Sequence, residues 1–556
     1  MAVCLSTINA AVNTVVKGEY LEENGVTIHV KDGYTTPEKA KPFFNPRMKT
    51  CRELVLATLG AFIKECGHQS PVNCLDAFGA SGVAGMQWKT RFGKFCHVTI
   101  TERDEICVQS IMGNSISNGF VPKPFILEFT RIPGLPFEPQ ERNEICVKQC
   151  DVSVMLHMEA FDFIHLDPFG CPVKYLTAAF TNMRNNGLIC VVATDLGSLL
   201  AKNANVAFRN YAANVVKTEY VQEAGARVLI AAAVRAAAQC SKGVEVLYAV
   251  NKDHFLIVGL RVRRGAVSAD SCVQSVCSVV HCQICGERVS FPPSQHLTDN
   301  PYDALPCCCH KDTAGRTAVL IGPLWCGSLF DATFVEKMFR EAVSENLSKA
   351  VVTLLSTLLL EAVCPNSVSE HLKVLQHIEE ILKASRQGES EIIPMVATDG
   401  ATQSSLNAMA AVQRTENRRE SVTLQSGKRQ SCVKLSGTNA ASCCQTECNS
   451  TSHKTDLEDD PKVTDRTDDT INAPKRAKLC DTGTETLVPN LDLAAIPCPM
   501  FYYDLHKKKL PGLNLPKTSK VISVLQTSGF KASRTHFCTT AVRTNANLTQ
   551  ILQLLQ

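Results

Sequence analysis

The sequence lacks an apolar run long enough for a membrane-spanning helix. Its longest uncharged apolar stretch, residues 350–360, has about half of the ~20 residues that a membrane span requires. Residues 1–19 also lack the basic start, the apolar middle and the cleavage site of a secretory signal peptide. From these two absences we expect a soluble protein that is neither inserted in a membrane nor secreted.

The sequence also lacks the regular cysteine spacing of a disulfide framework, although it contains 27 cysteines. The cysteines are scattered, and several lie within apolar runs, as Cys74, Cys96, Cys190 and Cys240 do. Because a chain of 556 residues can build a hydrophobic core without covalent cross-links, the thiols are predicted to be reduced. A reducing compartment, the nucleus or the cytosol, follows from that prediction.

The chain is too long for one hydrophobic core, and its length predicts roughly two to four units. A net charge of +3 is too small to indicate a partner, so the local distribution of charge is more informative. The residue composition and the pattern of apolar residues divide the sequence into four regions. They are an alternation of strands and helices over residues 1–265, a Cys- and His-rich and then helical module over 266–386, a polar insertion over 387–492, and a basic C-terminal segment over 493–556, which is expected to pack with the module.

Residues 1–265 alternate short apolar strands with helices. The expected strands are 73–78, 97–101, 144–149, 161–166, 188–193 and 255–263, and the expected helices are 51–66, 105–118, 173–183 and 207–240. Strands that are apolar on both faces and separated by helices indicate a mainly parallel, doubly wound α/β sheet. The later regions predict an additional α+β part with a small metal module.

The polar insertion, residues 387–492, is rich in Ser, Thr, Gln, Asn and charge and poor in aromatic residues. Such a segment cannot bury enough apolar surface to offset the entropy of ordering, so it is predicted to be disordered. Within it, residues 474–479 (Pro-Lys-Arg-Ala-Lys-Leu) have the composition of a short nuclear-import signal. We therefore expect the protein in the nucleus, with the nucleolus and the cytosol as alternatives.

The first strand of the sheet runs through Asp76 into a turn that contains Gly79, Ala80 and Gly82. Small residues in a turn between a strand and a helix let the backbone approach a ligand. The alternative is an ordinary tight turn. The turn has neither the GxGxxG spacing of a dinucleotide site nor the lysine of a P-loop, so a ligand without a pyrophosphate is favoured.

The next two strands end at acidic residues. The second strand ends at Glu102, which can accept hydrogen bonds from ribose hydroxyls. The third strand is followed by Asp151 and Val152, where the carboxylate can accept a hydrogen bond from an adenine amine. Together with the turn, these residues predict a nucleoside pocket at the carboxyl edge of the sheet, suited to S-adenosylmethionine (SAM).

The fourth strand runs directly into Asp167-Pro168-Phe169-Gly170. An exocyclic amine on a base is a poor nucleophile, because its lone pair is delocalised into the ring. The Asp167 carboxylate and the Pro168 carbonyl can accept hydrogen bonds from such an amine, and Phe169 offers a face on which a flipped base can stack. The alternative is a simple turn after a buried strand. Beside a nucleoside pocket, the motif predicts methyl transfer to a base amine.

The chain resembles the tRNA (guanine-N2-)-dimethyltransferase family, and within it the animal dimethyltransferase-like branch. Shared motifs occur in family order over roughly the whole part of the chain expected to be ordered. They are Phe44-Asn45-Pro46, Arg52, Ala80-Ser81-Gly82, Glu102, Asp151, residues 167–170, Thr194-Asp195, Glu223, Arg227, residues 322–325, residues 501–504, residues 533–537 and Arg543-Thr544. The resemblance implies SAM-dependent methylation of a guanine N2 at the hinge between the D and anticodon stems of tRNA, at position 26 or its neighbour. It also implies that Arg52 contacts SAM.

The sequence departs from the family pattern at four positions. Cys171 replaces a common Ser, Ala84 replaces an arginine of the SAM turn, Glu102 replaces a shorter Asp, and Ile257 replaces an arginine of the last catalytic-domain strand. These departures leave a second hypothesis open, a tRNA-binding paralogue with little or no catalysis that acts as an RNA chaperone. A third hypothesis is methylation of adenine N6 in another nucleic acid, which shares the amine chemistry.

The Cys- and His-rich module has the ligand spacing of a structural zinc site. Two pairs with a two-residue gap form the predicted set: Cys282, Cys285, Cys307 and His310. Cys308 or Cys309 could replace Cys307, and Cys326 is a more distant substitute. The alternative is a loop of apolar thiols. The family resemblance also implies a structural Zn²⁺ here, usually held by two Cys-x-x-Cys pairs.

From residue 501 to the end, the chain has eight Lys or Arg residues against one acid, Asp504. This surplus predicts phosphate contacts with tRNA. The predicted contacts are Lys507, Lys508, Lys509, Arg534, His536 and Arg543. The alternative is a solvated charged face in which the interleaved aromatic residues belong to the core. No feature indicates a partner subunit, so a monomer is expected.

Overall fold

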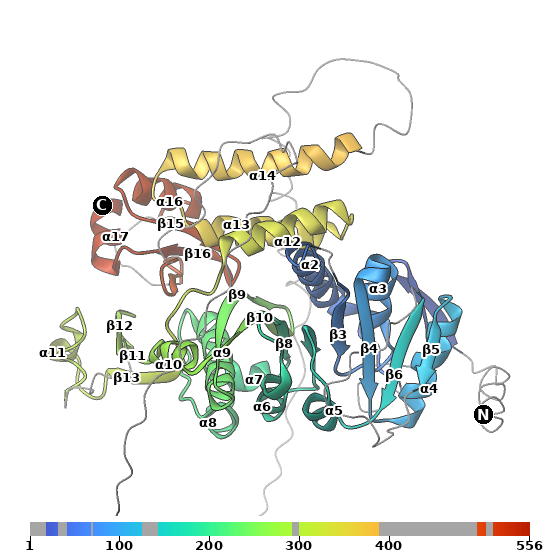
Figure 1. Ribbon diagram of the computed structural model, residues 1–556. Helices are drawn as coiled ribbons and strands as arrows, with labels where there is room; N and C mark the ends of the chain where they lie inside the picture. Colours follow the sequence, from blue (N-terminus) through green and yellow to red (C-terminus); the bar gives the residue numbers. More distant parts are fainter. Residues whose placement is uncertain are drawn as a thin grey trace, which may run out of the picture. The chain divides into compact units, whose positions relative to one another are not determined.

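An eight-stranded sheet in the order β5-β6-β4-β3-β7-β8-β10-β9 forms the centre of the first 265 residues (Figure 1). In that order its strands are Val121–Pro124, Glu144–Gln149, Cys96–Glu102, Val72–Asp76, Phe163–Leu166, Leu188–Ala193, Phe255–Arg264 and Lys242–Lys252. Strands β5 to β8 pair in parallel, and β10 is antiparallel to both β8 and β9. The predicted doubly wound α/β sheet is confirmed, with an antiparallel pair at one end.

The computed structural model describes residues 18–31, 42–67, 70–124, 143–291, 300–388, 498–507 and 515–556. Apart from residues 387 and 388, the predicted disordered insertion, with its basic segment 474–479, lies outside the described residues. Residues 1–391 and 490–556 belong to one compact unit, so the C-terminal segment is part of the same body as the sheet. Among the described residues, no helix is both long and apolar enough to span a membrane.

Helices cover the sheet on both sides. Every residue of β3, β7 and β8 is buried, and because successive side chains of a strand point to opposite faces, both faces of these strands are covered. The helices of this part are α2 (Lys49–Glu65), α3 (Val83–Phe92), α4 (Glu105–Ser117), α5 (Val152–Met158), α6 (Val173–Asn182), α7 (Leu196–Leu199), α8 (Ala204–Tyr211) and α9 (Val221–Gln239), with short 3-10 turns at Pro46–Met48 and Gly93–Phe95. A hairpin of β1 (Gly18–Glu23) and β2 (Val26–Lys31) packs against α3 and α4.

One predicted helix was wrong, and two strands of the sheet, β5 and β9, were not predicted. The helix expected over residues 207–240 is two helices, because Ala212 at the end of α8 has a left-handed backbone (φ 51°) that stops the helix. Strand β9 begins only two residues after Cys240, the last residue of the helix that was expected over 207–240.

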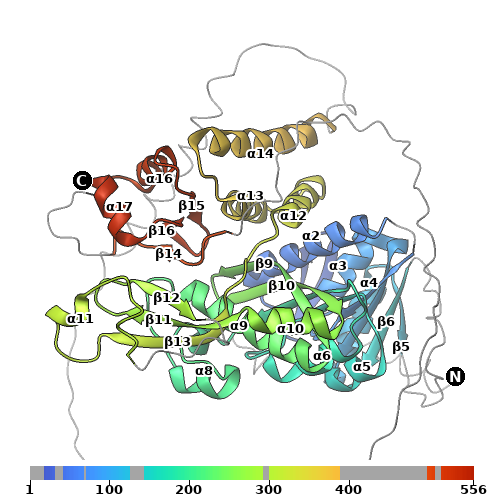
Figure 2. The same cartoon turned by 60° about the vertical axis from the view of Figure 1, so that its left-hand side comes forward.

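The middle module consists of a small sheet followed by helices (Figure 2). After α10 (Ala266–Gln274), strands β12 (Arg288–Phe291), β11 (Val276–Cys282) and β13 (Ala318–Trp325) form an antiparallel sheet in that order, with the short α11 (Cys309–Asp312) before β13. Helices α12 (Ala332–Ser344), α13 (Lys349–Val363) and α14 (Val368–Gly388) follow, and α12 packs against α2. The α14 helix therefore extends two residues into the region assigned to the insertion.

The C-terminal segment forms a second small sheet with two helices. Its elements are β14 (Tyr502–Tyr503), α16 (Thr518–Thr527), β15 (Ala532–Thr535), β16 (Cys538–Thr544) and α17 (Leu548–Leu555), with the strand order β14-β16-β15. Strand β15 contacts α13, and α16 contacts α14. The segment after the insertion thus packs on the helices that precede it.

Candidate active site

A pocket of about 180 Å³ lies where β3, β4 and β6 end. Its lining residues are Ala77, Phe78, Thr101, Glu102, Arg103, Cys150, Asp151, Val152, Lys174 and Tyr175. Three residues predicted to bind the cofactor, Glu102, Asp151 and Val152, are therefore brought together from two strand ends. The rings of Phe78 and Tyr175, which the sequence patterns did not single out, meet edge to face at 5.0 Å and form an aromatic wall.

The predicted turn between β3 and α3 is shaped by close packing against β4. A side chain at Gly79 would overlap Ile100, and Gly82 has φ +79°, a backbone conformation that glycine adopts without strain. The backbone N–H of Ala80 donates to Glu102 Oε2 at 3.1 Å. The small residues thus allow the turn to approach the next strand end and to hold the Glu102 carboxylate.

The two acidic strand ends are oriented by backbone N–H groups. The second oxygen of Glu102 accepts hydrogen bonds from the N–H groups of Arg103 (2.8 Å) and Asp104 (3.1 Å). Asp151 caps α5 by accepting a hydrogen bond from the Ser153 N–H at 2.8 Å. Both carboxylates are therefore held in fixed positions at the pocket.

Asp76 lies beneath the turn rather than in the pocket. It is only 2% exposed, and its Oδ2 accepts a hydrogen bond from the Gly85 N–H at 3.2 Å. Its Oδ1 lies 3.5 Å from Nδ1 of His165. Asp76 thus contacts the layer under the site, whereas the sequence pattern had placed it among direct cofactor contacts.

Arg52, on the first turn of α2, is buried and bound by a carboxylate. Its Nε and Nη2 donate to the two oxygens of Glu23, both at 2.6 Å, and its guanidinium lies 4.9 Å from the Phe44 ring centroid. Burial acts to raise the pKa of Glu23, but the hydrogen bonds and charge of Arg52, with a hydrogen bond from Gln87, hold that pKa below its ordinary value. The sequence did not indicate Glu23 as the partner of this arginine.

Residues 167–170 follow β7 directly and are tied to the end of β8. The Gly170 N–H donates to Thr194 Oγ1 at 2.9 Å, and the Thr194 N–H donates to the Gly170 carbonyl at 3.1 Å. Gly170 has φ +86°, which favours glycine at this turn. Because β7 lies beside β3, this turn and the pocket share one edge of the sheet.

Phe169 projects from this turn with 69% of its surface exposed, while Pro168 before it is buried. The Phe169 ring meets the Phe43 ring edge to face at 5.5 Å. Phe43 immediately precedes the Phe-Asn-Pro motif and was missed in the sequence, although its position was the available signal. An exposed Phe169 ring, supported at its edge by the partly buried Phe43 and next to a carboxylate, suits the stacking of a flipped base.

Asp167 is partly buried among charged and titratable groups. Burial raises the pKa of its carboxyl, Asp76 adds to that effect, and the charges of His165 and Arg52 oppose it. Cys51, on α2, and His165 each place a ligand atom within 4.8 Å of the Asp167 carboxylate. A carboxyl with a raised pKa is a better proton acceptor at neutral pH, which is the property that amine chemistry requires.

Asp195, of the Thr-Asp motif after β8, is held by a tyrosine. Its Oδ1 accepts a hydrogen bond from the Tyr211 hydroxyl at 2.7 Å, and burial raises its pKa. Tyr211 also contacts the thiol of Cys171, the residue that replaces the family's Ser. The substitution therefore preserves a polar partner for Tyr211 at the edge of the site.

Two residues predicted to bind RNA are buried instead. Arg543 is fully buried and donates to Glu223 and Glu361, each at 2.8 Å. The His536 side chain is 2% exposed, and its Nδ1 lies 2.7 Å from Glu361 Oε2. The buried charge of Arg543 is paired by the two glutamates, and the His536 ring is turned inward to Glu361, so neither side chain can reach a phosphate. The prediction for both residues was wrong.

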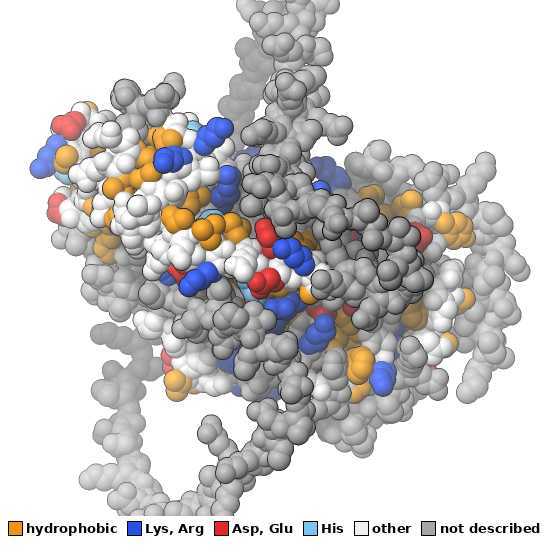
Figure 3. Space-filling view, turned by 90° about the horizontal axis from the view of Figure 1, so that it is seen from above, with side chains coloured by type: hydrophobic (Ala, Val, Ile, Leu, Met, Phe, Trp, Pro, Cys, Tyr) orange, Lys and Arg blue, Asp and Glu red, His pale blue; other side chains and the backbone are white. Residues whose placement is uncertain are grey.

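The remaining predicted RNA contacts have different outcomes. Lys507 is 68% exposed but lies 3.0 Å from Asp504, Arg534 is partly exposed, and Lys508 and Lys509 lie outside the described residues. The interleaved aromatic residues are buried, as the core alternative held: Phe501, Tyr502, Tyr503 and Phe537. In the coloured part of Figure 3, Lys and Arg side chains are spread among apolar and uncharged ones rather than gathered in one patch.

The buried ion pairs join segments that are far apart in the sequence. Glu223 on α9 binds both Arg227 and Arg543, and Glu361 on α13 binds Arg543 and His536. Burial acts to raise the pKa of Glu361, but the charges and hydrogen bonds of its partners bring it to about 2. The network therefore holds the C-terminal sheet on the part that bears the site.

Four thiols in the middle module can hold a metal ion. Cys282, Cys285, Cys307 and Cys309 place their sulfur atoms within 4.8 Å of one another. His310, predicted as the fourth ligand, is outside this group, and its ring lies 4.9 Å from the Tyr302 ring. Successive residues of a turn point in different directions, so sequence spacing alone could not choose between Cys309 and its neighbour. Four thiols suit the tetrahedral coordination of a structural zinc.

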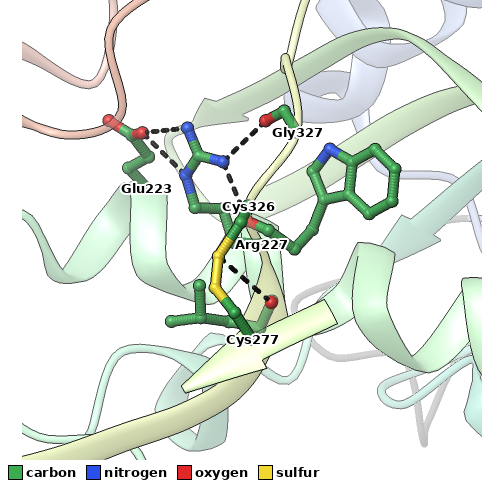
Figure 4. The surroundings of a disulfide bond; sticks show 7 residues. Glu223, Arg227, Cys277, Cys326 and Gly327 are labelled. Carbon is green, nitrogen blue, oxygen red and sulfur yellow. Dashed lines mark hydrogen bonds and ion pairs between the residues drawn. A yellow bond between two sulfur atoms is a disulfide. The ribbon is translucent and has the colours of Figure 1, made fainter. Parts of the chain in front are cut away.

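Cys277 and Cys326 form a disulfide beside the buried ion pair of Glu223 and Arg227 (Figure 4). Their Cα atoms are 6.1 Å apart, within the usual range for such a bond. No other pair of cysteines in the described ranges forms a disulfide. The prediction of reduced thiols is therefore wrong for this one pair, and Cys326 is removed from the substitutes for the metal site.

The model of the N2,N2-dimethylguanosine tRNA methyltransferase family matches residues 24–423 and 470–556. A tRNA (guanine(27)-N(2))-dimethyltransferase from Bos taurus is 36% identical over 538 residues, which is 97% of this chain and 62% of that protein. A tRNA (guanine(26)-N(2))-dimethyltransferase from Methanobrevibacter smithii is 28% identical over 350 residues, which is 62% of this chain and 81% of that protein. The chain thus spans less than two thirds of the length of its cattle relative.

The fold is also similar to a solved structure, Trm1 from Pyrococcus horikoshii in complex with S-adenosyl-L-methionine. The TM-score is 0.58 at 18% sequence identity, with 97% of this chain and 100% of that chain covered. At this identity the likeness shows the fold alone.

Proposed function

The chain belongs to the N2,N2-dimethylguanosine tRNA methyltransferase family, and we propose that it transfers methyl groups from SAM to the exocyclic N2 amine of a guanine in tRNA. The observation that carries this proposal is the position of Asp167. Its turn follows β7, next to β3 and the pocket lined by Glu102 and Asp151, so an amine acceptor and a nucleoside pocket share one sheet edge. Such an edge is where open α/β sheets bind their ligands.

The residues of the turn have distinct parts in the reaction. The Asp167 carboxylate and the Pro168 carbonyl accept the two N–H bonds of the guanine amine and direct its lone pair at the methyl donor. Phe169, with Phe43 at its edge, stacks on the flipped base. SAM, when bound, supplies the methyl group from its sulfonium. Alignment of the two reactants then lowers most of the barrier.

The residues proposed to form the SAM site are Arg52, Gly79, Ala80, Gly82, Glu102, Asp151 and Val152, with Asp76 in the layer beneath them. Glu102 would accept hydrogen bonds from the ribose hydroxyls, and Asp151 would accept one from the adenine amine. The glycine turn positions Glu102 through the Ala80 N–H, and Asp76 binds the Gly85 N–H beneath that turn. The two carboxylates, Glu102 and Asp151, fit the hydroxyl and amine groups of a nucleoside, because both are hydrogen-bond acceptors that backbone N–H groups already fix in position. Arg52 would hold the methionine carboxylate and would then share its charge with Glu23.

The target that we propose is the guanine at tRNA position 27, with position 26 as the alternative. Position 27 is named for the cattle relative, which aligns with 97% of this chain, and position 26 for the archaeal relative, which aligns with 62%. Both names specify guanine N2, which favours guanine over the adenine hypothesis. Two methyl groups are proposed from the same names.

The test uses purified chain, SAM and four unmodified tRNA transcripts that carry guanine at position 27 only, at 26 only, at both or at neither. Mass spectrometry of the nucleosides counts the methyl groups added to each. We expect dimethylguanosine whenever position 27 is guanine. Methylation only of the transcripts with guanine at 26 would move the target by one nucleotide, and no transfer to any transcript would overturn the enzymatic function.

A tRNA-binding paralogue with little catalysis is the second candidate, favoured by the state of three residues. Arg52 is already neutralised by Glu23, and the two positions where family arginines are replaced, Ala84 and Ile257, are buried. Calorimetry with SAM separates the candidates. No detectable SAM binding, with intact tRNA binding, would favour the chaperone.

The other proposals concern metal, RNA contacts and location. A structural Zn²⁺ is proposed at the four-cysteine group. After the loss of Arg543 and His536 from the RNA set, the proposed phosphate contacts are Lys507, Arg534 and the exposed Lys517 and Lys520, with Lys508 and Lys509 retained from the sequence. Nuclear localisation through residues 474–479 and a monomeric state remain proposals of the same kind.

A further inference from the structure

His165 is a buried imidazole directly under the proposed catalytic turn. It lies on β7, and Asp167 comes two residues later, in the turn that directly follows the strand. Its side chain is 4% exposed, and its ring centroid lies 6.0 Å from that of Trp88. Within the ranges that the structure describes, neither ring nitrogen has a hydrogen-bond partner. Buried polar atoms are rarely left in that state, which points to a role beyond packing.

Several titratable and charged groups surround His165. Asp76 is its register partner on β3, and Asp76 Oδ1 lies 3.5 Å from His165 Nδ1. A ligand atom of His165 also lies within 4.8 Å of both the Asp167 carboxylate and the Cys51 thiol. Arg52, next to Cys51 on α2, adds a positive charge that is already paired with Glu23. The imidazole is thus close both to a structural carboxylate and to the proposed catalytic one.

The proposed reaction needs a second acceptor for a proton. When an amine displaces a methyl group from a sulfonium, the new N-methyl amine carries one proton too many. Asp167 can take it, but a partly buried carboxylic acid then stands where a carboxylate is needed for the next transfer. A family named for two methyl groups on one nitrogen requires that carboxylate twice.

We propose that His165, whose Nδ1 lies 3.5 Å from Asp76, receives this proton from Asp167 and restores its carboxylate. The inference rests on the proposed function. An amine N–H bond breaks as an O–H bond forms on Asp167, and that O–H bond breaks as an N–H bond forms on neutral His165. The positive charge that leaves the sulfonium ends on the imidazolium, which Asp76 stabilises. A separation of up to 4.8 Å is bridged by one water or by a small side-chain movement. Because His165 acts through Asp167, it is a positioning residue.

The test compares His165→Asn with the wild type in single-turnover reactions at saturating SAM, from weakly acidic to weakly basic pH. Mass spectrometry records the first and second methyl transfers separately. For the wild type, we expect the rate to rise with pH, because burial raises the pKa of the Asp167 carboxyl. In His165→Asn, where that carboxyl has lost the neighbouring imidazole, the rise moves to higher pH, and the second transfer slows roughly tenfold more than the first. The dissociation constants for SAM and tRNA stay unchanged.

Phe163→Leu is the matched control, because Phe163 lies on the same face of β7 and also packs against Trp88. It is expected to lower Tm while leaving the pH profile and the ratio of the two transfers as in the wild type. His165→Gln, a second variant without a titratable ring, guards against a local defect of the asparagine.

The outcomes separate this inference from the proposed function. If Asp167→Asn is inactive but both His165 variants keep the wild-type pH profile and transfer ratio, the enzyme stands and the role of His165 is overturned. If the His165 variants have a lower Tm and weaker SAM binding but keep a wild-type pH profile, His165 has only a structural role. If the wild type transfers no methyl group to any tRNA, the proposed function fails and this inference fails with it.

Discussion

The edge of the central sheet and the basic C-terminal segment were both predicted from charged residues, and they have opposite structures. At the sheet edge, Glu102, Asp151 and Asp167 remain where a ligand can reach them, because each follows the end of a parallel strand. In the C-terminal segment, Arg543 and His536 turn inward and bind Glu223 and Glu361. A charge at the end of a parallel strand has a position set by local structure. A charged side chain on a short antiparallel strand can face the solvent or the core, and the position of its ion-pair partner decides between the two.

The largest expected effect is on catalysis and belongs to the sheet edge. Asp167→Asn removes the carboxylate that accepts the amine proton, and methyl transfer should fall on the order of 10³-fold. Tm and tRNA binding should stay unchanged, since Asp167 supports no packing that would be lost in an isosteric change. Asp270→Asn, at an exposed position on α10, is the control. Near-normal turnover by Asp167→Asn would show that the carboxylate at the sheet edge is not needed for catalysis, and the functional difference between the two regions would disappear.

The next effect is on stability and belongs to the C-terminal segment. Arg543→Met removes one guanidinium from two buried carboxylates, Glu223 and Glu361, which keep only Arg227 and His536 as ion-pair partners. Breaking such a buried pair costs about 3–5 kcal/mol of unfolding free energy. Urea unfolding measures this loss. Lys517→Ala, at an exposed position of the same segment, should leave stability unchanged and weaken only tRNA binding. If Arg543→Met were stable and specifically defective in tRNA binding, the buried arrangement would be contradicted.

The metal group distinguishes two adjacent residues. Cys309→Ser should lose the bound zinc and lower Tm, because it removes one of four ligands, whereas His310→Ala should retain the metal. Elemental analysis of the purified variants gives the metal content directly. Zinc lost from His310→Ala and kept in Cys309→Ser would restore the ligand set expected from the sequence.

Acid should weaken the C-terminal network through Glu361. Its folded-state pKa of about 2 lies below the ordinary 4.5, so its contribution is fully present above 4.5 and is lost as pH falls from there toward 2. The free energy of unfolding of the wild type should therefore fall over that interval. In Glu361→Gln, urea unfolding should show a flatter dependence there, and an equal slope would contradict the shift.

The smallest effect concerns the arginine at the cofactor site. Glu23→Gln should tighten SAM binding by roughly threefold to tenfold, because a methionine carboxylate would no longer share Arg52 with a second carboxylate. Glu22→Gln, at the exposed neighbouring residue, is the control. Calorimetry measures both. Weaker binding in Glu23→Gln would mean that Glu23 orients Arg52 for SAM instead of competing for it.

Prediction succeeded where local pattern and chemistry agreed. The apolar strands of residues 73–78 and 161–166 have one stable arrangement, a buried parallel sheet, and the residues after them fall at its edge. Prediction failed for Arg543, because its partner Glu361 lies 182 residues earlier and no local pattern connects them. It failed for His310 because a turn of three cysteines and a histidine offers several ligand sets, and only the backbone path selects one.

By itself, the sequence determined the α/β class, six of the eight strands of the sheet, and the acidic residues at its carboxyl edge, since burial periodicity and chain direction require no distant partner. Tertiary structure decided which charged and thiol groups face each other. It paired Glu23 with Arg52, placed Asp76 and Asp167 close to His165, gathered Cys309 with three other thiols, and buried Arg543. The physical reason is that pairing energies depend on distance in space and on burial, and neither quantity exists until the chain has folded.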